Sequence, residues 1–244
     1  GEAAGRAIKP VVLELGGSDP FIVLGDANLE KAVEVAVTAR FQNTGQSCIA
    51  AKRFIVVESA AAEFEERFAA AAKDLRRGAP IDPETQLGPM AREDLRDELA
   101  GIVDASVAAG ASVLTGGKAP DEKGAWYEPT VVSAAAGSDA PVLREETFGP
   151  VAAVVRVADE AAAIELANES EFGLGSSLWT QDLERAEKLA ADIESGMVFV
   201  NAMTASDPRI PFGGVKRSGV GRELGGEFGM RAFLNLQAVA LTEA

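Results

Sequence analysis

The chain has 244 residues, of which 47% are hydrophobic, and a formal net charge of −15, which fits a folded protein with one large or two small domains. The acidic charge disfavours nucleic acid as a partner, because phosphates demand Lys and Arg, and no apolar run reaches the roughly 20 residues of a membrane helix. The chain has no histidine and one cysteine, which excludes an internal disulfide, disfavours a metal site and suits the reducing cytoplasm.

The first part of the chain predicts two strands and a helix. An apolar run over residues 11–15 ends at a glycine pair and predicts a buried strand that contains Glu14. By itself, Glu14 is better explained as a solvated charge at a strand end than as a carboxylate of tuned pKa beside a reactive centre. Residues 21–24 predict a second strand, and Asn28 is a typical N-cap for an amphipathic helix whose apolar stripe ends at Phe41.

Strands and helices then alternate as far as Asn201 without internal repeats. The predicted strands cover residues 53–57, 112–114, 126–132, 151–157, 176–179 and 197–200, and the predicted helices cover residues 60–77, 94–110, 160–167 and 183–193. Pro129 makes the third of these strands an edge or irregular strand. The alternation is typical of an α/β fold, with a mainly parallel sheet and helices on both faces in a Rossmann-like three-layer arrangement.

Ligands of such sheets lie beyond the carboxyl ends of the strands. Glu14, Glu146 and Asn201 fall at or near predicted strand ends or in the loops that follow them. We therefore expect a binding site at that edge of the sheet.

The stretch after residue 207 is basic and rich in glycine. Residues 209–231 hold five basic side chains and two acidic ones, in a chain that is acidic as a whole. A flexible basic loop suits an anionic ligand, and a subunit contact or internal ion pairs explain the charges equally well. Residues 234–241 predict a closing strand that could extend a sheet in a neighbouring chain.

The only cysteine, Cys48, lies in the stretch F-Q-N-T-G-Q-S-C-I from Phe41 to Ile49. Because the chain has no histidine, a nucleophilic cysteine in it would need a carboxylate as its base. A second polar stretch, R-E-E-T-F-G-P, runs from Arg144 to Pro150. Taken alone, that second stretch is better explained as a solvated loop with a rigid corner.

Four stretches together resemble the motifs of the aldehyde dehydrogenase superfamily in order and spacing. They are V-L-E-L-G-G at 12–17, F-Q-N-T-G-Q-S-C at 41–48, E-E-T-F-G-P at 145–150 and P-F-G-G-V-K-R-S-G-V-G-R-E at 211–223. The 34-residue step from Glu14 to Cys48 also resembles that family's glutamate-to-cysteine spacing. Within the superfamily, the runs Q-S-C-I-A-A-K-R-F and A-S-D-P-R-I-P-F-G-G-V-K-R-S-G look most like those of bacterial succinate-semialdehyde dehydrogenases.

The resemblance implies an oxidoreductase that oxidises a small-molecule aldehyde, with succinate semialdehyde favoured, and uses NAD or NADP as its cofactor. It implies that Cys48 is the nucleophile, which forms a thiohemiacetal and then a thioacyl intermediate, and that Glu14 is the general base. The backbone N–H of Cys48 would contribute to the oxyanion hole. Glu146 resembles the acid that hydrogen-bonds the nicotinamide ribose, and Phe148 resembles the ring beside the nicotinamide.

The resemblance also points to residues that contact the substrate. Phe212 and Asn201 resemble residues near the family's substrate tunnel. Many relatives of this subclass carry an arginine that helps to hold the substrate carboxylate where this chain has Gln42. Arg209 is our own candidate for a partner of that carboxylate.

The family places most of its cofactor domain before the V-L-E-L-G-G strand, so the resemblance implies the catalytic domain of a larger enzyme. We expect residues 1–13 to be a remnant of a missing cofactor-binding domain, residues 14–233 to be the catalytic domain, and residues 234–244 to be an oligomerisation strand of a homo-oligomeric parent protein. Two alternatives stay open: an inactive domain with a structural or assembly role, and a cofactor-independent thiol esterase that uses Cys48 and Glu14. Cofactor binding tests the first alternative, and hydrolysis of an activated aryl ester tests the second.

Overall fold

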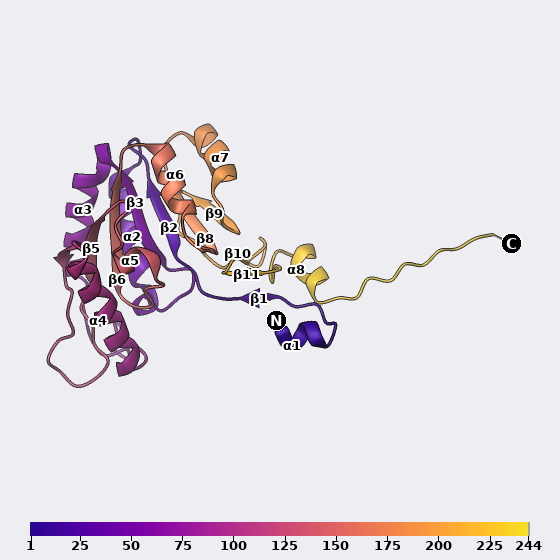
Figure 1. Ribbon diagram of the computed structural model, residues 1–244, viewed down its shortest axis with the longest axis horizontal. Coiled ribbons are helices and arrows are strands. Elements are labelled where there is room, and N and C mark those ends of the chain that lie inside the picture. Colours follow the sequence, from indigo (N-terminus) through magenta and orange to yellow (C-terminus); the bar gives the residue numbers. More distant parts are fainter. Residues whose placement is uncertain (244) are drawn as a thin grey trace.

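A seven-stranded sheet forms the centre of the computed structural model, which describes residues 1–243. Its strands are β2 (Asp19–Val23), β3 (Ala51–Val57), β4 (Ser112–Thr115), β5 (Thr130–Ala135), β6 (Val151–Val157), β8 (Gly175–Trp179) and β9 (Met197–Val200). They lie in the order β4-β5-β6-β3-β2-β8-β9, and every neighbouring pair is parallel except β4 with β5 (Figure 1). The predicted α/β fold with a mainly parallel sheet is confirmed.

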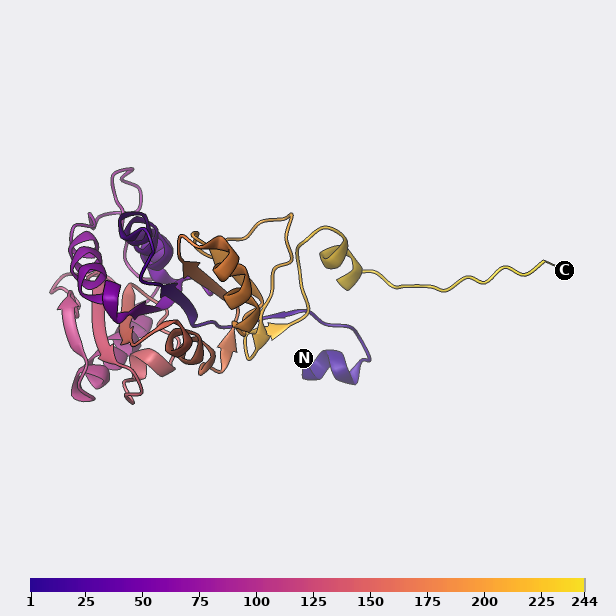
Figure 2. The same cartoon turned by 90° about the horizontal axis from the view of Figure 1, so that it is seen from above.

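Helices cover both faces of this sheet (Figures 1 and 2). The helices that pack around it are α2 (Leu29–Phe41), α3 (Glu58–Lys73), α4 (Glu93–Ala108), α5 (Pro141–Arg144), α6 (Glu160–Asn168) and α7 (Leu183–Asp192). On the α3 face, the ring centroid of Phe54 in β3 lies 4.6 Å from that of Phe68. The next residue of β3, Ile55, lines a cavity with Leu166 of α6, because successive strand residues point to opposite faces.

Strand β3 lies in the core of the sheet, between β2 and β6. All seven of its residues are buried, as expected for a parallel strand with neighbours on both sides and helices on both faces. Two of these buried residues are charged, Lys52 and Arg53. The helix that leads toward β3 begins where predicted, since the Asn28 side chain accepts a hydrogen bond from the N–H of Lys31 at 3.1 Å.

Shorter elements lie beside the main sheet. They are α1 (Glu2–Arg6), β1 (Leu13–Glu14), the 3₁₀ turn η1 (Gln42–Gly45), β7 (Phe172–Gly173), β10 (Val215–Lys216), β11 (Gly219–Val220) and α8 (Glu227–Ala232). Strand β1 pairs with β11, and β7 pairs with β10, both antiparallel. These two pairings tie the glycine-rich end of the chain to two earlier segments.

Two predictions about strands are wrong. The run at residues 11–15 does not enter the main sheet: only Leu13 and Glu14 form a strand, which pairs with β11, and Leu15 is 50% exposed. Pro129 does not mark an edge strand, because β5 begins at the next residue and lies between β4 and β6. A proline that stands before the first ladder hydrogen bond removes none of them.

Other predicted elements also differ from the structure, such as the strand at residues 126–132, which is found at Thr130–Ala135. Helix α3 ends at Lys73 rather than at Arg77, because Arg76 turns away to accept hydrogen bonds from the N–H groups of Gln86 and Leu87. Residues 234–243 contain no strand and leave the body of the chain as an extended segment (Figures 1 and 2). Pairing of that segment with a second chain stays a prediction.

A membrane-spanning helix was not expected from the composition. Within residues 1–243, none of the helices has the length and apolar character that crossing a membrane requires.

Gly196 tests how tightly the glycine-rich segment packs against the sheet. A Cβ added there would lie 1.8 Å from the carbonyl oxygen of Gly213, so we expect Gly196→Ala to lower the free energy of unfolding by about 1–3 kcal/mol. Gly101, in the exposed part of α4, is the matched control, because a Cβ there meets nothing within 4 Å. Gly101→Ala should raise the free energy of unfolding by roughly 0.5–1 kcal/mol. Urea denaturation measures both changes, and equal effects would contradict the packing.

Candidate active site

The residues predicted to take part in catalysis and cofactor binding lie near the amino ends of the central strands. Cys48 lies just before β3, Glu146 and Phe148 lie just before β6, and Glu14 lies in the segment that leads into β2. Because β2, β3 and β6 are neighbouring parallel strands, the segments that precede them meet at one edge of the sheet. The expectation of a site beyond the carboxyl ends is therefore wrong for these residues.

The turn before Cys48 is fixed by an unusual backbone. Asn43, Thr44 and Gly45 have φ angles of 53°, 56° and 71°, in the left-handed region that disfavours most side chains. A Cβ on Gly45 would lie 2.2 Å from the carbonyl oxygen of Gly149, and the buried Arg40 donates to the Gly45 carbonyl at 2.5 Å. The cysteine stretch therefore packs directly against the Phe-Gly-Pro turn.

The thiol of Cys48 is partly exposed and borders a small apolar cluster. Phe212, Leu174 and Met197 are its buried members, so Phe212 lies in the cluster that Cys48 borders, and its role as a substrate-tunnel residue stays a prediction. A separate cavity of about 310 Å³ adjoins the cysteine loop. Its lining includes Gln42, Ser47, Ile49 and Met203.

Burial raises the pKa of the Cys48 thiol. The positive charge of Lys52 opposes that shift, as do the backbone N–H groups of Ile49 and Cys48, whereas the charge of Asp19 adds to it. Glu14 is not among the groups that shift this pKa. Among these groups, Lys52 is the one whose charge most favours the thiolate form.

Glu14 is a half-buried residue of β1. Both carboxylate oxygens are shielded from solvent and have no hydrogen-bond partner within residues 1–243. Burial raises the pKa of Glu14, the charge of Glu223 raises it further, and Arg222 partly offsets the shift. A Cβ on Gly213 would lie 2.8 Å from Glu14 Oε1, which places the carboxylate beside the residue that follows Phe212. The direct pairing of Glu14 with Cys48 stays a prediction.

Glu146 is anchored by the glycine pair that follows Glu14. The N–H of Gly17 donates to Glu146 Oε1 at 3.0 Å, and the ammonium of Lys52 lies 3.6 Å from the same oxygen. A Cβ on Gly16 would lie 2.4 Å from Oε2, so only glycine leaves room for this carboxylate. Phe148, two residues on, is 41% exposed. Three of the four sequence motifs therefore interlock around Glu146 and Cys48.

Two predicted substrate residues are placed less favourably. The Asn201 amide donates to the Thr180 carbonyl at 2.8 Å and accepts from the Thr180 N–H at 3.1 Å. Asn201 follows β9, at the carboxyl end of the sheet, so its side chain holds a turn there and the substrate role is not supported. Arg209 is 85% exposed in its side chain and pairs with Asp207.

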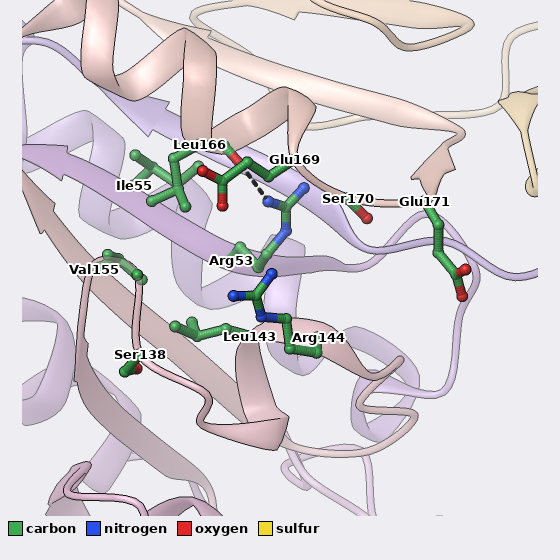
Figure 3. Close-up of a pocket in the computed structure, with 11 residues that line it drawn as sticks. Arg53, Ile55, Ser138, Leu143, Arg144, Val155, Leu166, Glu169, Ser170 and Glu171 are labelled. Carbon is green, nitrogen blue, oxygen red and sulfur yellow. Dashed lines mark hydrogen bonds between the residues drawn. The ribbon is translucent and has the colours of Figure 1, made fainter.

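A cavity of about 330 Å³ lies between α5 and α6, on the face of β3 opposite to α3 (Figure 3). Arg53 lies at its centre and donates to the Leu166 carbonyl at 2.8 Å. Arg144 and Glu169 approach from the two helices. None of the predicted site residues lines this cavity, so it is separate from the cysteine site.

Sequence reasoning missed the charged residues buried beneath the site. Lys52 and Arg53 open β3, Asp19 opens β2 and Arg40 closes α2, and all four are buried. A polar residue at the end of an apolar run is normally interpreted as a solvent-exposed residue at the end of a strand or helix. The signal that was available is the pair of basic residues directly after the cysteine stretch.

Comparison with known proteins agrees with this geometry. A model described as "Aldehyde dehydrogenase family" matches residues 1–239, and the chain belongs to that family. It is 54% identical over 239 residues to a protein of Escherichia coli (strain K12) named as a succinate semialdehyde dehydrogenase that uses NAD(P)+. It is 54% identical over 236 residues to a protein of Mycobacterium avium (strain 104) named as a succinate-semialdehyde dehydrogenase that uses NADP(+).

The alignments cover 98% and 97% of this chain but 51% and 50% of the two relatives, so the chain spans about half their length. Among solved structures, a succinic semialdehyde dehydrogenase from Streptococcus pyogenes in complex with NADP+ superposes with a TM-score of 0.94 at 38% identity. That superposition covers 99% of this chain and 52% of the other.

Asp19 gives a test of the buried charges through pH. Burial raises the pKa of Asp19 to about 6 from its usual 3.8, so the folded state holds the proton more tightly than the unfolded state. The contribution of Asp19 to the free energy of unfolding should therefore fall as pH rises from about 4 to above 6, by about 3 kcal/mol at most.

Urea denaturation of the wild type and Asp19→Asn across this range isolates that contribution. The variant keeps an acceptor for the N–H of Gly175, which donates to Asp19 Oδ1 at 3.0 Å. The difference between the two proteins should decline with rising pH. A difference that is flat or grows would show that Asp19 is not held protonated.

Proposed function

We propose that the protein containing this chain oxidises an aldehyde to a carboxylic acid with NAD or NADP as the hydride acceptor, and that succinate semialdehyde is its favoured substrate. The observation that carries the proposal is the position of Cys48. Cys48 borders an apolar cluster, and the loop that carries it lines a cavity and is linked to Glu146 through Lys52. The names of the relatives support the substrate.

In this proposal, Cys48 attacks the aldehyde carbon as a thiolate and forms a thiohemiacetal. Glu14 takes the thiol proton, and later a proton from the water that cleaves the thioacyl intermediate and releases the acid. Its buried, unpaired carboxylate has a raised pKa, and a stronger base is what both steps need. The N–H of Cys48 would stabilise the oxyanion.

The cofactor, when bound, accepts the hydride that leaves the thiohemiacetal. The residues present fit its nicotinamide half. Glu146 keeps Oε2 over Gly16 while Gly17 holds Oε1, which leaves an acceptor for a ribose hydroxyl. The exposed ring of Phe148 would lie beside the nicotinamide.

We also propose that the parent protein is a homo-oligomer of the cytoplasm. The apolar side chains of Phe233, Leu234, Leu236, Val239 and Leu241 are all exposed in this chain. A second copy that covered them would remove a large apolar surface from water.

Cys48→Ser tests the nucleophile. A hydroxyl beside the same groups is a far weaker nucleophile than a thiolate at neutral pH. In the protein that contains this chain, kcat for aldehyde oxidation should therefore fall by more than about 1000-fold. The thermal midpoint should stay close to that of the wild type, because the two side chains are similar in size. Appreciable turnover by the folded variant would remove Cys48 from this role.

Arg209→Ala tests the partner of the substrate carboxylate. If Arg209 leaves Asp207 to bind the substrate, the variant should raise KM for succinate semialdehyde about 10-fold or more. KM for an uncharged aldehyde of the same length is the control and should change little. Equal effects on both aldehydes would eliminate Arg209 as the carboxylate partner.

A further inference from the structure

A buried ammonium lies directly beneath the cysteine loop. Lys52 is the second residue of β3, and its side chain is 0% exposed. Its Nζ donates to the carbonyl oxygens of Ser47 at 3.2 Å, Cys48 at 2.9 Å and Ala50 at 3.1 Å. An ammonium has three N–H donors, and here all three serve the loop that carries the thiol.

Such a group is expensive to bury. Burial lowers the pKa of Lys52 to about 8, and the neighbouring charge of Arg40 lowers it as well. The charges of Asp19, Glu146 and a Cys48 thiolate act in the opposite direction. A buried lysine needs such partners, and an apolar side chain would fill the same place in β3 without this cost.

The direction of the side chain links two parts of the proposed site. From β3 the ammonium reaches the Cys48 carbonyl on one side and lies 3.6 Å from Glu146 Oε1 on the other. Glu146 is itself held by the N–H of Gly17 at 3.0 Å. One cation therefore joins the loop of the nucleophile to the carboxylate proposed for the cofactor ribose.

We propose that Lys52 is a positioning residue for the nucleophile: its ammonium fixes the backbone around Cys48, keeps a positive charge beside the thiol, and ties both to Glu146. The inference rests on the proposed role of Cys48 and adds the cation that favours its thiolate against the effect of burial. Thiolate and ammonium stabilise each other, so each favours the charged form of its partner.

The charged groups that face Lys52 come from several elements. They are Asp19 in β2, Arg40 in α2, Cys48 before β3 and Glu146 before β6. Replacing Lys52 by a neutral residue leaves Arg40 as the remaining cation of this set. Arg40 is not among the groups that shift the Cys48 pKa, so it does not substitute for Lys52.

Alkylation of the only cysteine tests the proposal without aldehyde or cofactor. The rate of Cys48 modification by iodoacetamide is measured from pH 6 to pH 10 in the wild type and in Lys52→Met. An opposite charge within about 4–6 Å of a titratable group lowers its pKa by about 1–3 units. The midpoint of the variant profile should therefore move up, and its rate at pH 7 should fall about tenfold or more.

Lys216→Met is the matched control. Lys216 Nζ also donates to two backbone carbonyls, those of Asn168 at 2.8 Å and Ser170 at 3.1 Å, but it does not act on the thiol. Its profile should match that of the wild type. An unchanged midpoint in folded Lys52→Met, or an equal shift in Lys216→Met, would reduce Lys52 to a structural role and overturn the proposal.

Lys52→Gln covers the case in which the Met variant does not fold. The amide keeps two donors for the loop carbonyls and removes the charge, so the same upward shift is expected. If neither variant folds, the ¹⁵N NMR signal of the Lys52 ammonium in the wild type decides. It should titrate at lower pH after Cys48 is alkylated, and an unchanged titration would refute the coupling.

The two proposals fail in different ways. If Cys48→Ser retains aldehyde oxidation while Lys52→Met shifts the alkylation profile, the proposed role of Cys48 as the nucleophile is wrong and the role of Lys52 in the thiol's ionisation stands. If Cys48→Ser is inactive and the profile does not shift, the function stands and the role of Lys52 is wrong.

Discussion

The parallel pairing of β2, β3 and β6 is the constraint on which the candidate site depends. Parallel strands bring all their amino ends to one edge, so three segments far apart in the sequence converge there. Ala51 stands opposite Asp19 in one pairing, and Arg53 stands opposite Ala153 in the other. This register places Cys48 near the glycine pair and near Glu146. Glycine then allows contact: Gly45 against Gly149, and Gly16 against Glu146.

Charges buried at this edge hold the converging loops in place. Lys52 binds the carbonyls of the cysteine loop, and Arg53 donates to the carbonyl of Ser18 before β2 and to those of Leu166 and Ala167 in the last turn of α6. Loops and the last turns of helices have backbone groups that no regular partner satisfies, and long cationic side chains reach them from within the sheet. The same cations stand close to Asp19 and Glu146, so the support of the loops and the electrostatics of the thiol are one system.

The sequence predicted features that depend on local patterns. The Asn28 cap, helix α2 and strands β3 and β6 follow from periodicity and side-chain chemistry within a short window. The motif resemblance predicted the gathering of Cys48, Phe212 and Glu146, because it carries information about distant contacts that periodicity lacks. The prediction of a buried strand at residues 11–15 was wrong because the partner of this segment, β11, lies some 200 residues away in the sequence.

The sequence did not indicate which edge of the sheet carries the candidate site, or that Lys52 is buried beneath it, for a different reason. The rule that ligands lie beyond the carboxyl ends describes most open α/β sheets, and no pattern near Cys48 indicates the opposite edge. Whether a lysine at a strand end is solvated or buried depends on which loop folds over it. Lys52 lies under its own neighbours in the sequence, Ser47 to Ala50, and only the turn at Asn43 and Thr44 brings them there.

The raised pKa values of Cys48 and Glu14 have the same main cause, which is burial. Burial penalises each negative charge that is added to the site. In the proposed mechanism, transfer of the proton from Cys48 to Glu14 moves the negative charge from oxygen to sulfur and leaves the total unchanged. Loss of the thiol proton to solvent would instead add one negative charge. The thiolate then forms beside Lys52, whose ammonium is already in place. In the proposed mechanism, a buried base and a buried nucleophile are therefore easier to operate together than either would be alone.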